Sequence, residues 1–370
     1  MRRAHDAARA RPVKALRAVI LAACVGAFAP AAALPAGEPS RDQERADGWR
    51  VIVRSLPARP RVLFVGAHPD DENAVAGLLS WLAARGELVM VTLTAGHNLD
   101  TRARMPHARG RTPPVPREPW GDPPARRGSE LAARRAAVVR TVAELLGARQ
   151  AIVGPFVNGP LALAELDGAE GDGPYRDWRG EAPEIVLAKW GRDVGADADA
   201  APRFLARMIR TFRPDAVVSF DGWCGGTGHP EHLAAAAALA RALTLAGEEE
   251  KPAGDAPGDA RMGRARPLWI TSAFIAPPLA ACGYCKCRGE PPREPVLVLD
   301  LEAAPPAPGP QRAPSPRVAK CLALIHYATA SRQGGVSSRQ TAALRRLCEG
   351  PARARTPARE EIRIMTPPEP

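Results

Sequence analysis

The chain has 370 residues, of which 45% are hydrophobic and 25% charged, a composition typical of a globular protein that can bury a sizeable core. Its formal net charge is +11, but the basic residues are scattered among Ala and Pro, and only 5% of the residues are aromatic side chains suited to stacking on bases. These features exclude nucleic acid as the expected partner.

The first 36 residues, 1–36, have the pattern of an export signal. A basic leader is followed by the apolar run Ala18–Ala33, which ends in small residues. We expect cleavage after this run and a protein that is secreted, periplasmic or held in the cell envelope. The alternative is a lipoprotein, because Leu21-Ala22-Ala23-Cys24 fits a lipoprotein box that would place a lipid anchor on Cys24. No later apolar stretch is long enough to span a bilayer.

Cysteine usage agrees with export to an oxidising compartment. Removing Cys24 with the signal leaves an even number of cysteines, for which disulfides are the natural expectation. The pairing cannot be deduced from the sequence, and the closely spaced group 282–287 offers a metal site as the alternative. The cysteines that remain are Cys224, Cys282, Cys285, Cys287, Cys321 and Cys348.

Hydrophobic periodicity predicts alternating strands and helices after the signal. This alternation indicates an α/β fold, a Rossmann-like, doubly wound and mostly parallel sheet with long loop insertions. We assign one domain to 37–345 and a disordered tail to 346–370. The expected strands are 61–65, 87–93, 151–153, 215–220, 268–275 and 296–301, and the expected helices are 73–85, 130–146, 202–212, 232–245 and 318–330.

Three segments rich in Pro, Gly, Arg or Asp interrupt this alternation: 98–127, 155–201 and 248–266. We expect them to be loops. The first two follow strands, and ligands of an open α/β sheet bind beyond the carboxyl ends of its strands. These two loops are therefore placed to shape a substrate pocket.

Two histidine-containing motifs lie at strand ends. His68-Pro69-Asp70-Asp71-Glu72 follows the first strand, and His229-Pro230-Glu231-His232 follows the strand 215–220 after a glycine-rich turn. Acids at a helix start have an ordinary structural explanation, since they favour the positive end of the helix dipole. That explanation does not account for the histidines. A hydrolytic zinc site needs about three N or O ligands, which two adjacent strand ends can supply.

Together these motifs resemble those of the LmbE-like or PIG-L (N-acetylglucosaminyl deacetylase) family, over about 61–242 of this chain. The resemblance implies that His68, Asp71 and His232 bind Zn²⁺, although Fe²⁺ can occupy similar ligands. It also implies that Asp70 is the general base and that His229 stabilises or protonates the tetrahedral intermediate. The glutamate at 231 replaces the family's usual aspartate, a change expected to matter little.

The implied function is zinc-dependent hydrolysis of a linear amide, removing the acetyl group of an N-acetylated sugar or glycoconjugate. The alternatives are a zinc-dependent O-acyl esterase and a catalytically silent glycan-binding envelope protein with structural zinc. Small-molecule or glycan substrates are the expected partners. Further candidates for substrate binding are Arg135, His97, Asp221 and Trp223, although an exposed helix arginine is the simpler interpretation of Arg135.

Overall fold

The computed structural model describes residues 48–97, 128–168, 178, 180–226, 228–248, 266–270, 297–306, 314–330, 348 and 359–364. All of them belong to one compact unit, Arg45–Pro370. The predicted export signal, Cys24, the cysteines at 282, 285 and 287, and nearly all of the loops 98–127 and 248–266 lie outside the described residues.

Within the described residues, seven strands form a central sheet in the order β3-β2-β1-β4-β5-β7-β6. The first five strands in that order run parallel, while β7 is antiparallel to both of its neighbours. The predicted α/β class and mostly parallel sheet are confirmed. The strands are β1 (Arg61–Gly66), β2 (Glu87–Thr94), β3 (Gln150–Phe156), β4 (Ala216–Phe220), β5 (Arg266–Ile270), β6 (Leu297–Asp300) and β7 (Arg359–Ile364).

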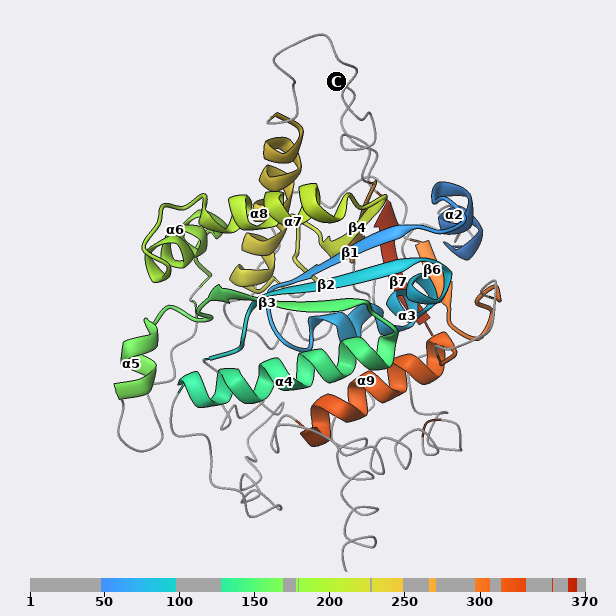
Figure 1. The fold of residues 1–370 in the computed structure, drawn as a ribbon, viewed down its shortest axis with the longest axis horizontal. Helices are drawn as coiled ribbons and strands as arrows, with labels where there is room; N and C mark the ends of the chain where they lie inside the picture. The colour runs from blue at the N-terminus through green and yellow to red at the C-terminus, as the bar shows by residue number, and fades with distance from the viewer. Residues whose placement is uncertain are drawn as a thin grey trace, which may run out of the picture. The chain divides into compact units, whose positions relative to one another are not determined.

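Helices cover both faces of the sheet, because alternate side chains of a strand point to opposite sides. On β1, Val62 and Phe64 belong to the core that α3, α4 and α9 close, while Leu63 and Val65 belong to the core closed by α6, α7 and α8. Figure 1 shows α4 and α9 on one side of the sheet and α7 and α8 on the other. The helices are α2 (Gly48–Ser55), α3 (Ala76–Arg85), α4 (Gly128–Leu146), α5 (Leu163–Gly168), α6 (Pro183–Asp193), α7 (Ala200–Phe212), α8 (Pro230–Glu248) and α9 (Pro316–Ala330).

The chain order of the strands reverses between β1 and β4. From β1 the sheet continues to β2 and β3 on one side, and to β4 and β5 on the other. Crossovers leave such a switch point in opposite directions and open a crevice at the carboxyl ends of the two strands. The two histidine motifs follow β1 and β4, so the topology brings them to the same crevice.

The segment 155–201 differs from the predicted loop, because it contains α5 and α6. Pro183 stands in the first turn of α6, where its missing N–H costs no helical hydrogen bond. Val186 and Trp190, four residues apart, are fully buried. Burial of this face outweighs the local abundance of Gly, Pro and Asp that suggested a loop.

The C-terminal segment also differs from the disordered tail that we predicted for 346–370. Cys348 is joined to Cys321 of α9 by a disulfide, and β7 is part of the sheet. Glu360 of β7 is buried and accepts hydrogen bonds from the backbone N–H of Gly77 and of Leu78, at 2.9 and 2.8 Å. It thereby caps the start of α3, whose first N–H groups have no partner within the helix.

Among the described helices, none has the length and apolar character needed to cross a membrane. The disulfide between Cys321 and Cys348 confirms that cysteines of this chain are paired, and Cys224 is disulfide-bonded as well.

Candidate active site

The turn after β1 is organised by the buried carboxylate of Asp71. Its Oδ2 accepts the backbone N–H groups of Ala67 and His68, at 2.7 and 2.8 Å. Its Oδ1 is left facing Nε2 of His232, 3.1 Å away. Although burial opposes ionisation, the neighbouring His232 and His68 hold the pKa of Asp71 well below its ordinary value. Asp71 is therefore an anion whose second oxygen points at the imidazoles.

His232, in the first turn of α8, is fixed on three sides. Its Nδ1 lies 2.8 Å from the carbonyl oxygen of Gly225, to which it donates. The ring stacks on Phe220 at the end of β4, with centroids 4.1 Å apart and planes 7° from parallel. Gly225 has a φ of 52°, and a Cβ there would lie 2.8 Å from the Cβ of His232, so only glycine allows this approach. Nε2 is consequently aimed at Asp71 and His68.

Glu231 holds His68 in the complementary orientation. Its Oε2 accepts from Nε2 of His68, while its Oε1 accepts the N–H of Gly159 at 2.7 Å. Glu231 is completely buried, and although burial opposes it, the proximity of His68 lowers the pKa of Glu231 to about 2. Nδ1 of His68 is thereby turned toward Asp71 and His232. The prediction that glutamate at this position would matter little does not anticipate these contacts.

Three electron-pair donors converge between the strand ends. Nδ1 of His68 lies 3.1 Å from Nε2 of His232, which lies 3.1 Å from Oδ1 of Asp71, and the third side of the triangle is 3.8 Å. Ligands about 2.1 Å from a tetrahedral zinc are separated by roughly 3.4 Å, which matches this triangle. Each imidazole donates its other N–H to an oxygen, as metal-binding histidines do. The residues present therefore fit a divalent cation.

His229 completes a cluster of three histidines with the character of a metal site. One ring nitrogen from each of His68, His229 and His232 lies within 4.8 Å of the others. Nδ1 of His229, however, accepts the backbone N–H of Glu231 at 3.2 Å. A neutral His229 with an accepting Nδ1 carries its proton on Nε2, so it can donate a hydrogen bond to a reacting group.

Asp70 lies beside this cluster in a strained conformation. Its φ of 101° is rare for a residue other than glycine, and such strain is concentrated at functional sites. Nη2 of Arg135 donates to the carbonyl of Pro69 at 2.8 Å and to Oδ2 of Asp70 at 3.2 Å. The side chain of Asp70 remains 50% exposed. Desolvation raises the pKa of Asp70, and Arg135 opposes that rise.

Arg135 itself is buried, which corrects the interpretation as an exposed helix residue. It extends from α4 past Gly96, where a Cβ would collide with the guanidinium. Its contacts with Pro69 and Asp70 keep the strained turn in place. The Arg135 side chain points toward the turn after β1 rather than toward solvent because of how α4 packs against the sheet. Hydrophobic periodicity alone does not specify that packing.

The remaining candidates occupy different places. Oδ1 of Asp221 accepts backbone N–H groups of Trp223, Cys224 and Gly225 at 3.0, 2.6 and 3.1 Å, so Asp221 shapes the turn that carries the Gly225 carbonyl. Trp223 is partly buried in that turn. His97, three residues beyond β2, lines a cavity next to the strand ends. Contacts of these three residues with substrate stay predictions.

Comparison with known proteins agrees with the motifs. Residues 63–243 match the family model described as PIG-L, GlcNAc-PI de-N-acetylase. A 1D-myo-inositol 2-acetamido-2-deoxy-alpha-D-glucopyranoside deacetylase of Streptomyces avermitilis is 31% identical over 208 residues, covering 53% of this chain and 56% of the relative. The enzyme of the same name from Mycolicibacterium smegmatis is 30% identical over 194 residues, covering 51% and 55%. The chain thus spans about half the length of the curated relatives it matches.

Solved structures are similar at a lower level. N,N'-diacetylchitobiose deacetylase from Pyrococcus horikoshii aligns with a TM-score of 0.37 and 15% identity, covering 82% of this chain and 83% of that one. GalB, a 4-carboxy-2-hydroxymuconate hydratase from Pseudomonas putida, aligns with a TM-score of 0.41 and 16% identity, covering 84% and 97%. The matched segment 63–243 includes both histidine motifs, so the similarity to the PIG-L family extends over the residues that build this site.

Proposed function

We propose that this protein is a zinc-dependent hydrolase that removes the acetyl group from an N-acetylated sugar or glycoconjugate. The observation that carries the proposal is the convergence of His68, Asp71 and His232 next to a half-exposed carboxylate, Asp70. A purely structural metal does not need a strained acidic residue beside it. The curated relatives named as deacetylases of an acetamido sugar support the choice of substrate class.

In this proposal His68 Nδ1, Asp71 Oδ1 and His232 Nε2 hold the ion. A zinc ion with three protein ligands keeps a position for water, lowers the pKa of that water to about 7 and polarises the acyl carbonyl. Iron can use the same ligands. The two imidazoles meet the requirement for oriented ligands, because Glu231 and the Gly225 carbonyl engage their other nitrogens.

The side chains around the ion divide the proton transfers between them. Asp70 accepts a proton from the attacking water, since its carboxylate is accessible and Arg135 keeps it in place through Oδ2. His229 donates from Nε2 to the oxygen on which negative charge develops, or to the departing amine nitrogen. Its ring centroid is 4.9 Å from that of His68 and 5.2 Å from that of His232, so it borders the same space.

We also propose that the protein acts outside the cytoplasm, either cleaved from its export signal or anchored at Cys24. The basic leader and the apolar run Ala18–Ala33 support export, and the disulfide between Cys321 and Cys348 fits an oxidising compartment. The substrate would then be a sugar or glycan that this compartment contains.

Metal analysis of the purified protein, combined with acetate release from matched substrates, tests the activity. We expect about one equivalent of bound zinc and hydrolysis of an N-acetyl sugar at least tenfold faster than of the corresponding O-acetyl ester. Faster hydrolysis of the ester would identify an esterase instead. Bound zinc without acetate release from either substrate would favour the silent, glycan-binding alternative.

A further inference from the structure

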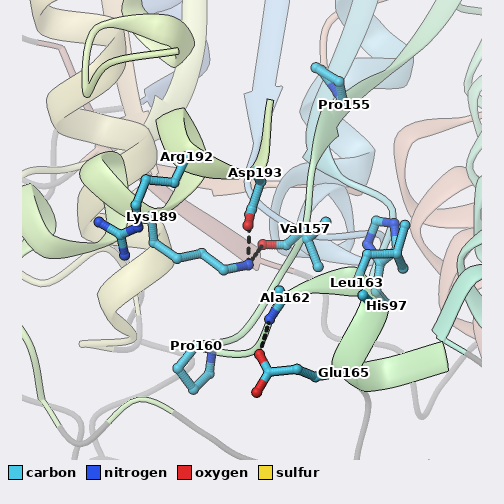
Figure 2. A pocket seen from close by; sticks show the side chains of 11 residues that line it. His97, Pro155, Val157, Pro160, Ala162, Leu163, Glu165, Lys189, Arg192 and Asp193 are labelled. Carbon is cyan, nitrogen blue, oxygen red and sulfur yellow. Dashed lines mark hydrogen bonds and ion pairs between the residues drawn. The ribbon is translucent and has the colours of Figure 1, made fainter. Parts of the chain in front are cut away.

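A cavity of about 570 Å³ opens beside the candidate active site, and we call it the β3 pocket. Figure 2 shows the ends of Lys189 and Asp193 meeting near Val157, with His97 on the opposite side. The pocket lies between α6, α5 and the segments that follow β2 and β3. Its lining residues are His97, Pro155, Val157, Pro160, Ala162, Leu163, Ala164, Glu165, Lys189, Arg192 and Asp193.

Two connections, one through hydrogen bonds and one through packing, link the β3 pocket to the catalytic residues. Gly159, between the lining residues Val157 and Pro160, donates its N–H to Glu231, which holds His68. On the other side His97 adjoins Gly96, against which the Arg135 guanidinium packs on its way to Asp70. The pocket is thus next to the metal ligands at the carboxyl edge of the sheet, where ligands of such folds bind.

The charges that line the pocket cancel. Nζ of Lys189 lies 2.6 Å from Oδ2 of Asp193 and donates to the Val157 carbonyl at 2.9 Å, with both charged side chains almost fully buried. Arg192 and Glu165 are exposed and contribute one charge of each sign. A phosphate or carboxylate entering the pocket would meet as many negative groups as positive ones, so this lining gives no net attraction to an anion.

His97 adds an unsatisfied polar group. Its Nδ1 is buried and makes no hydrogen bond to the described part of the chain. Burial and the charge of Lys189 lower the pKa of His97 to about 4, which keeps the ring neutral near pH 7. A neutral imidazole can both donate and accept, and a buried polar atom without a partner is costly unless a ligand or water supplies one. A hydroxyl group meets this requirement.

We propose that the β3 pocket binds the uncharged, polyhydroxylated ring of the substrate, with His97 and the Lys189–Asp193 pair as specificity-determining residues. This inference rests on the proposed function and deepens it by placing the sugar. The apolar wall from Pro155, Val157, Pro160 and Leu163 contacts the C–H groups of the ring. The polar residues exchange hydrogen bonds with its hydroxyls. A fatty acyl chain fits less well, because it would leave the buried His97 Nδ1 unpaired.

Ligand-observed NMR titration with N-acetylglucosamine and with its 6-phosphate tests the pocket independently of turnover. The variants are His97→Leu and the double variant Lys189→Met/Asp193→Leu, which removes both charges together so that neither is left buried alone. The control is Arg203→Met/Asp197→Leu, which removes an exposed ion pair between α7 and the segment before it, and neither residue lines the pocket. Bound metal and circular dichroism are measured for each protein.

We expect the wild-type protein to bind the neutral sugar more tightly than the phosphate ester. His97→Leu should raise the dissociation constant for the neutral sugar about threefold to tenfold, the effect of one lost uncharged hydrogen bond, with metal content unchanged. The double variant should weaken binding at least as much, and the control should not. Unchanged affinity in the folded His97→Leu protein, or preference for the phosphate ester, would overturn the proposal.

The outcomes also separate the pocket from the proposed activity. If wild-type protein releases acetate but the pocket variants bind the sugar normally, the pocket assignment is wrong and the activity stands. If the sugar binds in a His97-dependent manner and no acetate is released, the pocket stands and the proposed activity is wrong.

Discussion

Replacing Glu231 by Gln removes a charge but almost no volume, so it tests how the site orients His68. The carboxylate accepts two hydrogen bonds, one from His68 Nε2 through Oε2 and one from the Gly159 N–H through Oε1 at 2.7 Å. Glutamine has one acceptor oxygen and an NH₂ group that can only donate. Whichever way the amide is turned, its NH₂ group must therefore face either the His68 Nε2–H or the Gly159 N–H, and that donor loses its acceptor.

The expected result is weaker metal binding. Losing a carboxylate that orients a histidine ligand typically costs about 10- to 100-fold in metal affinity, or roughly 1.4 to 2.7 kcal/mol. Zinc affinity is measured by competition with a chromophoric chelator, with Glu87→Gln as the control. Glu87 is exposed, pairs with Arg149 and lies at the opposite end of β2 from the site. Zinc affinity equal to wild type in Glu231→Gln would refute the orienting role.

Three further expectations follow from the contacts of Asp71, Glu360 and Cys321. Asp71→Asn should lose both zinc and acetate release, which metal analysis and a turnover assay check together, because the amide is a poor substitute for an anionic ligand. Glu360→Ala should lower the free energy of unfolding by about 3 to 5 kcal/mol in a urea titration, since it leaves the buried Lys320 without its anion at 2.8 Å. A loss below 1 kcal/mol would argue against that pair. Peptide mapping without reduction should find Cys321 linked to Cys348 and no peptide that begins at Met1, whereas an intact, reduced chain would contradict export.

The sequence alone predicts most of the parallel sheet, because fully buried strands read as short apolar runs. β1 and β4 are almost completely buried, and both were expected within a residue or two of their observed ends. β7 was not expected, since Arg359, Glu360 and Glu361 suggest a solvated segment. Its formation depends on pairing with β5 and β6 and on the burial of Glu360 against α3 and Lys320. These are tertiary contacts that no local pattern contains.

The sequence likewise predicts only some of the residues of the candidate site. Motif spacing at two strand ends was sufficient to expect His68 and Asp71 beside the histidines of the second motif, because adjacent parallel strands end at one edge. The choice of His232 as the third ligand came from the resemblance to the family. The roles of Glu231 and Arg135 depend on where their side chains turn after the helices have packed. For the β3 pocket, Lys189 and Asp193 at helical i, i+4 spacing are visible in the sequence, but their burial is not.

The measurement that tests the central claim most directly compares zinc content and acetate release in Asp70→Asn and wild-type protein on one N-acetyl sugar. Asp70 is not one of the three converging ligands, and its side chain is half-exposed beside them. The variant should therefore keep its zinc while turnover falls by about 10²- to 10⁴-fold, the usual effect of losing a general base. Near-normal turnover with zinc bound would contradict the account and move the proton acceptor elsewhere.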